Sequence, residues 1–235
     1  MSAAAIRLSP EQANPPLLVF GGTFDPVHLG HLGAVSALRD ALHVETVIWL
    51  PVGEPPHRPR PAASAAHRLA MLQLALAGEP DCVIDTRELD RSGPSYTVLS
   101  LEELKAEYPD HPLCLALGLD AALGLTQWYR WQEVLALGGI AVMRRPGWSL
   151  PEPLPQWWRD AQCDPHRPVP TSGGWIRFVD IPPVDVAAAD IRANLMHGRS
   201  VEAKVPAAVA GYIKEHALYG KNTRCLLYTS PSPRD

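Results

Sequence analysis

The sequence predicts an α/β fold in which a doubly wound parallel sheet is covered by helices on both faces. Short apolar runs alternate with segments of helical periodicity along most of the chain, which is typical of βαβ units. The chain has 235 residues, 46% of them hydrophobic, and this suffices for one substantial core. It contains no internal repeat.

The first half of the chain opens with this alternation. Residues 17–20 form a short apolar run ended by two glycines, which favours a buried strand. Residues 29–42 carry apolar side chains at helical spacing, and the β-rich run 45–50 ends at a proline. Residues 65–78 have the pattern of a helix, and the glycine at the end is a plausible stop.

The alternation continues to the end of the chain. Residues 82–85 are predicted as a brief strand and residues 95–107 as a helix. Two more strands are expected at 113–118 and 139–145, with a shorter helical stretch between them. The remaining predicted elements are a last strand at 175–181 and helices near 189–198 and 206–217.

Three segments fall outside the pattern. Residues 146–174 hold seven of the 25 prolines and three of the seven tryptophans, so we expect a long crossover loop that packs its aromatic rings on the body. Residues 1–16 are expected to be a flexible arm. Residues 221–235 change composition abruptly and resemble translated adapter sequence, so we treat them as a non-native or disordered tail. The expected domain is therefore 17–220.

Composition and charge narrow the class of protein. The formal net charge of −4 gives no reason to expect nucleic acid or an anionic membrane as a partner. No apolar run approaches the roughly 20 residues of a membrane-spanning helix, and the N-terminus lacks the pattern of a secretory signal. The four cysteines are widely spaced, which argues against a disulfide framework and a cysteine zinc site. We therefore expect a cytoplasmic protein.

The most informative stretch is VFGGTFDPVHLGHLGAV, residues 19–35. A strand, a glycine turn and a helix start place backbone N–H groups at a helix N-terminus, where an anion binds favourably. His28 and His31 share one face of the first helical turn, and Gly30 between them leaves room for a bulky group. The stretch is neither a Walker A loop nor a Gly-x-Gly-x-x-Gly motif.

Three interpretations of the two histidines compete. They could bind a metal, but no third ligand lies nearby in the sequence and the glutamate of a His-Glu-x-x-His motif is absent. They could be ordinary core or surface residues, which is the usual outcome for two histidines in a helix. They could instead donate to phosphate oxygens, and their place above a glycine turn at a helix N-terminus favours this interpretation.

The stretch GGTFDPVHLGHL resembles the signature of the HxGH nucleotidyltransferases, and residues 17–220 resemble the bacterial nicotinate-mononucleotide adenylyltransferases. The further matching segments are PPHR (55–58), HRLAML (67–72), ELDRSGPSYTVLSL (88–101), LGLDAALGLTQWYRW (117–131) and VPAAVAGYIKEHALY (205–219). This ordered set is far more specific than any one motif. The resemblance implies a Rossmann-like fold, ATP and nicotinate mononucleotide as substrates, Mg²⁺ with the ATP, and a role in NAD biosynthesis.

In the reaction that the resemblance implies, a phosphate monoester attacks the α-phosphorus of ATP and pyrophosphate leaves. Such a phosphate has a second pKa of about 6, so it is largely ionised at neutral pH and no general base is required. The residues needed are cations, N–H donors and positioning groups. We expect His28 and His31 to neutralise the bridging and leaving phosphates, and Arg192 to grip the triphosphate.

The other binding residues are carried over from the matching motifs. The positions implied for ATP are Gly21, Gly22, Thr23, Phe24, Gly30, Gly118, Asp120 and Arg192. Those implied for nicotinate mononucleotide are Arg58, Tyr96, Thr97 and Trp128. The predicted helix 95–107 begins beside Tyr96, and its N-terminus favours a carboxylate over a neutral amide, which suits nicotinate rather than nicotinamide.

Simpler roles exist for several of these side chains taken alone. Asp120 is expected to face a ribose, but it could also be a helix N-cap. Asp25 could simply favour the turn before Pro26. Arg192 alone would most often be a solvated helix residue, and core packing is plausible for Trp131.

One departure from the family pattern concerns the phosphate end of the site. The family usually has Ser-Ser-Thr or Ser-Ala-Thr where this chain has Ala187, Ala188 and Ala189. Hydrogen bonds to charged groups are worth about 1.5–3 kcal/mol each, so we expect weaker ATP binding or slower turnover, but not loss of activity.

Two rival functions and one structural question stay open. A pantetheine-phosphate adenylyltransferase would have no use for the RSGPSYT and QWYRW elements. A non-catalytic nucleotide-binding protein would fit the three alanines, but the retention of His28, His31 and Arg192 counts against it. A homo-oligomer is possible, and the sequence does not decide it.

Overall fold

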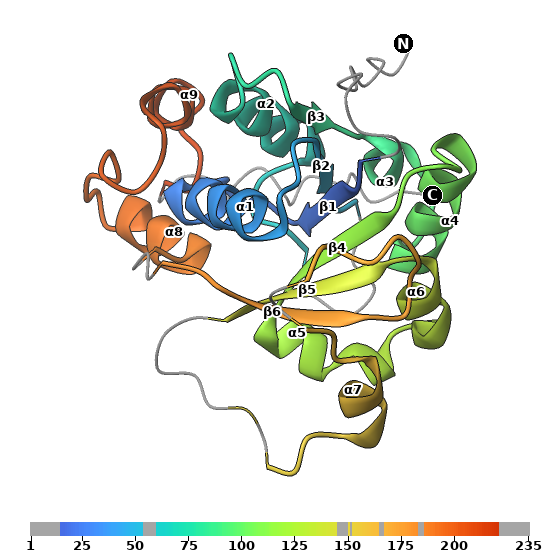
Figure 1. Cartoon of the computed structure of the whole chain (residues 1–235). Coiled ribbons are helices and arrows are strands. Elements are labelled where there is room, and N and C mark those ends of the chain that lie inside the picture. The colour runs from blue at the N-terminus through green and yellow to red at the C-terminus, as the bar shows by residue number, and fades with distance from the viewer. Residues whose placement is uncertain are drawn as a thin grey trace, which may run out of the picture.

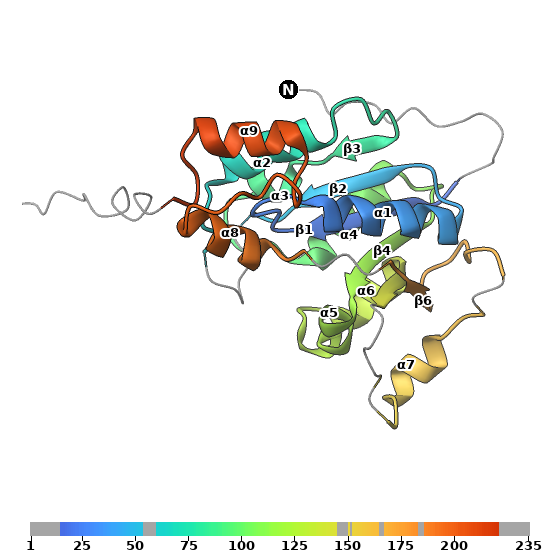
Figure 2. The ribbon, with the colours of Figure 1, turned by 90° about the vertical axis from the view of Figure 1, so that its left-hand side faces the viewer.

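The computed structural model describes residues 15–53, 60–144, 150, 152–164, 167–182 and 186–220. Within them, six parallel strands form one sheet in the order β3-β2-β1-β4-β5-β6 (Figures 1 and 2). The strands are β1 (Leu17–Gly22), β2 (Val47–Pro51), β3 (Cys82–Ile84), β4 (Leu113–Gly118), β5 (Gly139–Arg144) and β6 (Ile176–Asp180). This is the doubly wound, Rossmann-like sheet that the sequence predicts, and each strand lies where it was expected.

Helices cover the sheet on both faces (Figure 1). On one face lie α1 (Leu29–Leu42), α2 (Ala65–Ala75), α8 (Ala188–Met196) and α9 (Ala207–Glu215). On the other face lie α4 (Thr97–Glu107), α5 (Leu119–Leu123), α6 (Trp131–Leu137) and α7 (Gln156–Ala161). Two shorter elements, α3 (Arg87–Asp90) and the 3₁₀ turn η1 (Leu125–Gln127), join them.

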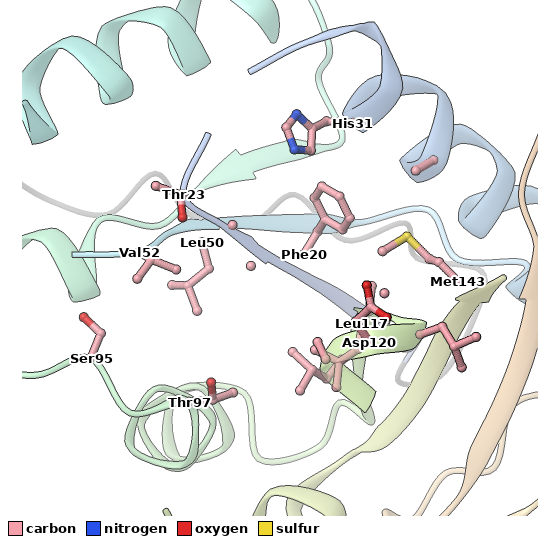
Figure 3. Close-up of a pocket in the computed structure, with 18 of the residues that line it drawn as sticks. Phe20, Thr23, His31, Leu50, Val52, Ser95, Thr97, Leu117, Asp120 and Met143 are labelled. Atoms are coloured by element: carbon pink, nitrogen blue, oxygen red, sulfur yellow. The ribbon is translucent and has the colours of Figure 1, made fainter. Parts of the chain in front are cut away.

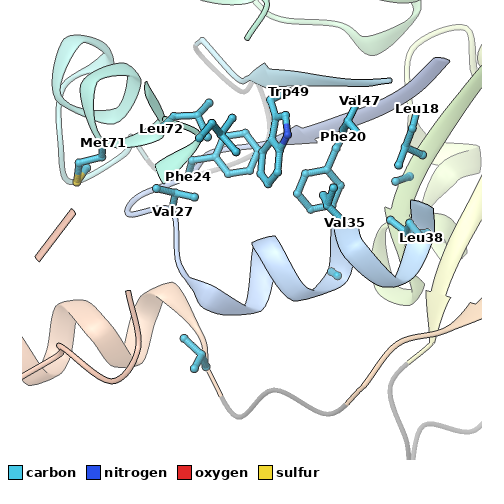
Figure 4. Packing of buried hydrophobic residues seen from close by; sticks show 14 of the residues in the cluster. Leu18, Phe20, Phe24, Val27, Val35, Leu38, Val47, Trp49, Met71 and Leu72 are labelled. Atoms are coloured by element: carbon cyan, nitrogen blue, oxygen red, sulfur yellow. The ribbon is translucent and has the colours of Figure 1, made fainter. Parts of the chain in front are cut away.

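The strand side chains divide between two cores because successive residues of a strand point to opposite faces. In β1, Leu18 and Phe20 pack beneath α1, whereas Leu17 and Val19 pack on the α4 side. All four are at most 4% exposed, which explains why a doubly covered strand reads as a continuous apolar run. Figure 4 shows the aromatic centre of the first core, where Phe20 lies against Trp49 with ring centroids 4.9 Å apart.

The crossover between β5 and β6 differs from the expected loop. It contains α7, because the run between Pro155 and Pro165 has no proline to interrupt one short helix. The expected packing of its aromatic rings is confirmed for two tryptophans. Trp158 is fully buried against Phe178, and the ring of Trp157 lies 5.0 Å from that of Trp131. The core role considered for Trp131 therefore agrees with its surroundings.

The flanking segments predicted as an arm and a tail lie almost wholly outside the described residues, at 1–14 and 221–235. Their assignment stays a prediction. Among the residues that the structure describes, no helix combines the length and the apolar character needed to cross a membrane.

Candidate active site

A cleft of about 580 Å³ opens at the carboxyl ends of β1 and β4 (Figure 3). These neighbouring strands lie where the strand order reverses, between β1 in one half of the sheet and β4 in the other. The connections that follow the two strands leave on opposite faces, so the chain separates and a crevice forms. This is the usual place for a ligand in an open α/β sheet.

The cleft collects most of the residues predicted for ATP. Six of the eight positions predicted for ATP line it, together with the catalytic candidates His28 and His31: Gly21, Gly22, Thr23, His28, Gly30, His31, Gly118 and Asp120. Phe24 does not, because its side chain is only 2% exposed and packs in the core below. Phe24 adopts a left-handed φ of 49° that turns the chain sharply after β1, so it can contribute to the cleft only through its backbone. The glycine-rich end of β1 thus exposes backbone to the cleft.

His28 and His31 form a stacked pair at the start of α1. Their ring centroids are 3.7 Å apart and the planes are inclined by 24°. His28 is the N-cap residue of α1 and is 5% exposed. Its backbone N–H donates to Nδ1 of His31 at 3.2 Å, so Nδ1 is an acceptor and the neutral His31 ring carries its proton on Nε2.

Gly30 explains how α1 and α8 approach each other at the cleft. A Cβ added to Gly30 would lie 3.0 Å from Nδ1 of His28 and 3.4 Å from the carbonyl oxygen of Val186. Val186 directly precedes Ala187, the N-cap residue of α8. The space beside Gly30 is therefore used first by the His28 ring and the start of α8, and not only by an incoming ligand.

Arg192, which was predicted to bind the triphosphate, is not among the residues that line the cleft. Its Nη1 donates to the carbonyl oxygen of Asp25 at 2.6 Å and lies 3.9 Å from a carboxylate oxygen of the same residue. The side chain is 33% exposed, so it is not a fully solvated helix residue. Its link to Asp25 joins α8 to the turn between β1 and α1.

The start of α4 forms the wall opposite the histidines, as Figure 3 shows for Thr97 and His31. Tyr96 is the N-cap residue of α4 and Thr97 its first helical residue, and both line the cleft. Trp128 also lines it, half-buried, and beside it Tyr129 packs on Tyr96 with ring centroids 4.8 Å apart. Arg58, the remaining residue predicted for the acceptor, lies outside the described residues.

Asp120 lies at the N-terminal end of α5. The helix N-cap is Gly118, so the alternative role of Asp120 as the N-cap is wrong. Asp120 instead lies in the first helical turn, exposed at the cleft, where its carboxylate is accessible to a ligand.

Several residues that line the cleft were missed by the sequence reasoning, among them Glu88 and Tyr129. Glu88 is 4% exposed, and its Oε1 accepts a hydrogen bond from the Ser100 hydroxyl at 2.8 Å. Burial raises the pKa of the Glu88 carboxyl, and Ser100 and Arg91 oppose this effect only in part. Tyr129 is 52% exposed although it lines the cleft. Glu88 and Tyr129 belong to the matching segments 88–101 and 117–131. The family resemblance was the one sequence signal that could have indicated these two residues.

The described residues contain no group of three or more histidine, cysteine, aspartate or glutamate side chains that could hold a metal ion. The metal-binding interpretation of His28 and His31 therefore gains no third ligand within that part of the chain. At α8, the N-cap residue is Ala187, which has no hydroxyl and makes no side-chain capping bond.

Comparisons with known proteins indicate the family to which the chain belongs. The cytidylyltransferase-like family model matches residues 19–194. An Aeromonas hydrophila protein named "Probable nicotinate-nucleotide adenylyltransferase" is 42% identical over 211 residues, which cover 87% of this chain and 97% of its own. A Methylococcus capsulatus protein of the same name is 41% identical over 207 residues, covering 86% and 99%. A solved Plasmodium falciparum nicotinic acid mononucleotide adenylyltransferase, complexed with NaAD, shares the fold with a TM-score of 0.67 at 14% identity, covering 88% of this chain and 98% of that one.

Proposed function

This chain belongs to the cytidylyltransferase-like family, among its nicotinate-nucleotide adenylyltransferases, and from that membership we propose how the cleft at β1 and β4 works. The chain transfers the AMP moiety of ATP to nicotinate mononucleotide, giving nicotinate adenine dinucleotide and pyrophosphate in NAD biosynthesis. The observation that carries the proposal is that His31 lies across the cleft from Thr97 at the start of α4 (Figure 3) and that His28 stacks on His31.

The chemical step needs positioning and charge stabilisation more than proton transfer. An oxygen of the acceptor phosphate forms a bond to the α-phosphorus of ATP, and the bond from that phosphorus to the oxygen of the β-phosphate breaks. The pyrophosphate leaves with the electron pair. Because the acceptor phosphate is largely ionised at neutral pH, the protein contributes donors and cations placed around the transferred group.

His31 is suited to donate from Nε2. The His28 backbone N–H donates to Nδ1, so the neutral ring carries its proton on Nε2 and can offer this N–H to a phosphate oxygen. His28 stacks on it and adds a second imidazole at the same helix start. The N-terminus of α1 favours negative charge at this point. We assign the bridging and leaving phosphates to this pair.

Arg192 and the glycine turn complete the phosphate end. Arg192 uses Nη1 to hold Asp25, and a guanidinium has further N–H donors for a phosphate. The backbone from Gly21 to Phe24 is assigned to the α-phosphate. Asp120 is assigned to a ribose, because an exposed carboxylate can accept from two hydroxyls.

Magnesium enters this proposal as part of the Mg-ATP substrate. The cleft carboxylates Glu88 and Asp120 form no metal-binding group within the described residues, whereas ATP phosphates hold Mg²⁺ well with few protein ligands. The protein residues named here therefore act on the phosphates themselves.

The acceptor is assigned to the α4 side of the cleft. The start of α4 at Tyr96 and Thr97 offers N–H donors to the nicotinate carboxylate, and Trp128 offers a face for the pyridine ring. Arg58 stays a prediction from the resemblance. This arrangement favours nicotinate over nicotinamide because the amide carries no charge to interact with the helix N-terminus.

The first experiment is pyrophosphate release from Mg-ATP with nicotinate mononucleotide, nicotinamide mononucleotide or phosphopantetheine. We expect release with the nicotinate substrate well above the amide. Release only with phosphopantetheine would show that phosphopantetheine, and not nicotinate mononucleotide, is the acceptor. No release with any of the three would favour a non-catalytic nucleotide-binding protein.

A matched pair of variants connects the activity to the cleft. His31→Asn keeps an acceptor for the His28 N–H but removes Nε2, so kcat should fall by about 10²–10³-fold. His43→Asn makes the same change at the exposed C-terminal end of α1, where asparagine tolerates the left-handed φ of 51°. Its activity should match the unmodified protein, and equal activity in both variants would contradict the role of His31.

A further inference from the structure

Asp25 is the point where distant segments of the chain meet. The residue is 6% exposed, and its carboxylate accepts the backbone N–H of Ala62 at 2.7 Å and of Ala63 at 3.0 Å. It also accepts the hydroxyl of Tyr219, 194 residues away in sequence, at 2.7 Å. A buried carboxylate needs such donors, since an unpaired one is costly. Three donors from two segments therefore fix the orientation of Asp25.

Asp25, held in this orientation, in turn binds the side chain of Arg192. Nη1 of Arg192 donates to the Asp25 carbonyl oxygen and lies 3.9 Å from its Oδ2. Within the part of the chain that the structure describes, the Arg192 guanidinium makes no other hydrogen bond. The position of its remaining donors thus depends on where Asp25 is held.

A second arginine holds the same turn from α2. Nη1 of Arg68 donates to the carbonyl oxygen of Thr23 at 2.7 Å, and the Arg68 residue is 2% exposed. Burial lowers the pKa of Arg68, while the nearby Asp25 and Tyr219 oppose this effect. The turn from Thr23 to Asp25 is therefore bound on one side by Arg68 and on the other by the contacts of Asp25.

Tyr219 reaches this turn from the end of the described chain. Its side chain is 6% exposed, and its backbone has a left-handed φ of 63°. A non-glycine residue in this region costs of order 1 kcal/mol or more and persists only where surrounding contacts hold it. α9, which precedes Tyr219, is itself tied to α2 by a hydrogen bond of 3.0 Å between Tyr212 and His67.

We propose that Tyr219 is a positioning residue of the reaction, because its hydroxyl orients the Asp25 carboxylate and Asp25 in turn places Arg192 and the Thr23–Asp25 turn at the phosphate end of the cleft. This inference rests on the proposed function. It assigns to the C-terminal segment a role in nucleotide binding, although Tyr219 itself does not line the cleft.

The test compares two Tyr→Phe variants that each remove one hydroxyl. Tyr219→Phe removes the donor to Asp25, whereas Tyr212→Phe removes the hydrogen bond to His67 on the same C-terminal segment. For Tyr219→Phe we expect kcat/KM for Mg-ATP to fall about tenfold, as for the loss of one hydrogen bond to a charged group, with the KM for nicotinate mononucleotide unchanged. Tyr212→Phe should keep both constants.

A binding measurement separates the outcomes. We expect the Kd of a non-hydrolysable ATP analogue, measured by calorimetry, to rise about tenfold in Tyr219→Phe and to stay unchanged in Tyr212→Phe. Unchanged ATP kinetics and Kd in Tyr219→Phe would overturn the inference and leave the function intact. Equal losses in both variants, with lower Tm, would also overturn it by showing a structural role only. If the unmodified protein binds the analogue but releases no pyrophosphate, the proposed function fails, and the ratio of Kd values still decides the role of Tyr219.

Discussion

Ala187 stands at the N-cap of α8, where no side chain accepts from the N–H groups of the first turn. We predict that Ala187→Ser together with Ala189→Thr raises kcat/KM for ATP, because each hydroxyl that reaches a phosphate adds about 1.5–3 kcal/mol of interaction. The gain should be tenfold or more, by the rule that about 1.4 kcal/mol is a factor of ten. Steady-state pyrophosphate release at varied ATP measures it.

The control for the double variant Ala187→Ser with Ala189→Thr must separate an effect on helix capping from an effect on ATP binding. A serine at the N-cap stabilises a helix by about 1 kcal/mol without any ligand. Ala193→Ser introduces a hydroxyl at an exposed position of the same helix and should leave ATP kinetics unchanged. If the double variant raises Tm but not kcat/KM, the missing hydroxyls were never needed for ATP in this chain.

Glu88 predicts a dependence of stability on pH. Because burial raises its pKa above the ordinary 4.5, the folded protein still holds this proton at pH values where the unfolded chain has released it. The stability contributed by the protonated group is present below 4.5 and is lost as the pH rises through the native pKa.

The variant Glu88→Gln removes this dependence and keeps an acceptor for Ser100. We therefore expect the Tm of the unmodified protein, relative to Glu88→Gln, to decrease as the pH rises above 4.5. Thermal unfolding of both proteins across this range measures the difference. A constant difference would show that Glu88 titrates normally in the folded protein.

At the scale of the elements, the start of α1 depends on the absence of a side chain at Gly30. A methyl group there would lie 3.0 Å from Nδ1 of His28 and 3.4 Å from the carbonyl oxygen of Val186, so either the ring or the start of α8 must shift. A displacement of about 1 Å in a catalytic group costs up to 10²-fold in rate, and we expect Gly30→Ala to lower kcat by roughly 10- to 100-fold.

Gly211 provides the matched control for this change. It lies inside α9, and a Cβ added there meets no atom within 4 Å. Gly211→Ala should therefore stabilise the protein by about 0.5–1 kcal/mol and leave kcat unchanged. Denaturant unfolding and pyrophosphate release on both variants test the pair, and equal kcat values would mean that His28 tolerates the shift.

The elements could be predicted from the sequence because their signals are local. The two glycines after residues 17–20 and the histidines at the start of α1 lie within one strand–turn–helix unit, and helical periodicity marked α1 and α4. The helix α7 was missed because the prolines around it outweighed the short run that forms it. The partners of Asp25 could not be predicted, since Ala62 and Tyr219 lie 37 and 194 residues away and carry no local pattern.

At the scale of the whole molecule, the two cores determine stability and the cleft determines ligand binding. The core on the α4 side contains Trp158, which is fully buried, whereas Trp128 is half-buried at the edge of the same core and lines the cleft. The parallel strands set the position of the cleft at their carboxyl ends, and the cores set the stability of the sheet that carries it. The same substitution at the two positions should therefore have different effects.

We predict that Trp158→Ala destabilises the protein by about 3–5 kcal/mol, the usual cost of deleting a buried aromatic side chain, with the KM values of the folded protein unchanged. Trp128→Ala should cost less stability, because its ring is already partly in solvent, but should raise the KM for nicotinate mononucleotide and leave the KM for ATP unchanged. Urea unfolding together with initial rates at varied acceptor measures both effects. A raised acceptor KM in Trp158→Ala would show that the shape of the cleft depends on the packing of this core, and an unchanged one in Trp128→Ala would place the pyridine ring elsewhere in the cleft.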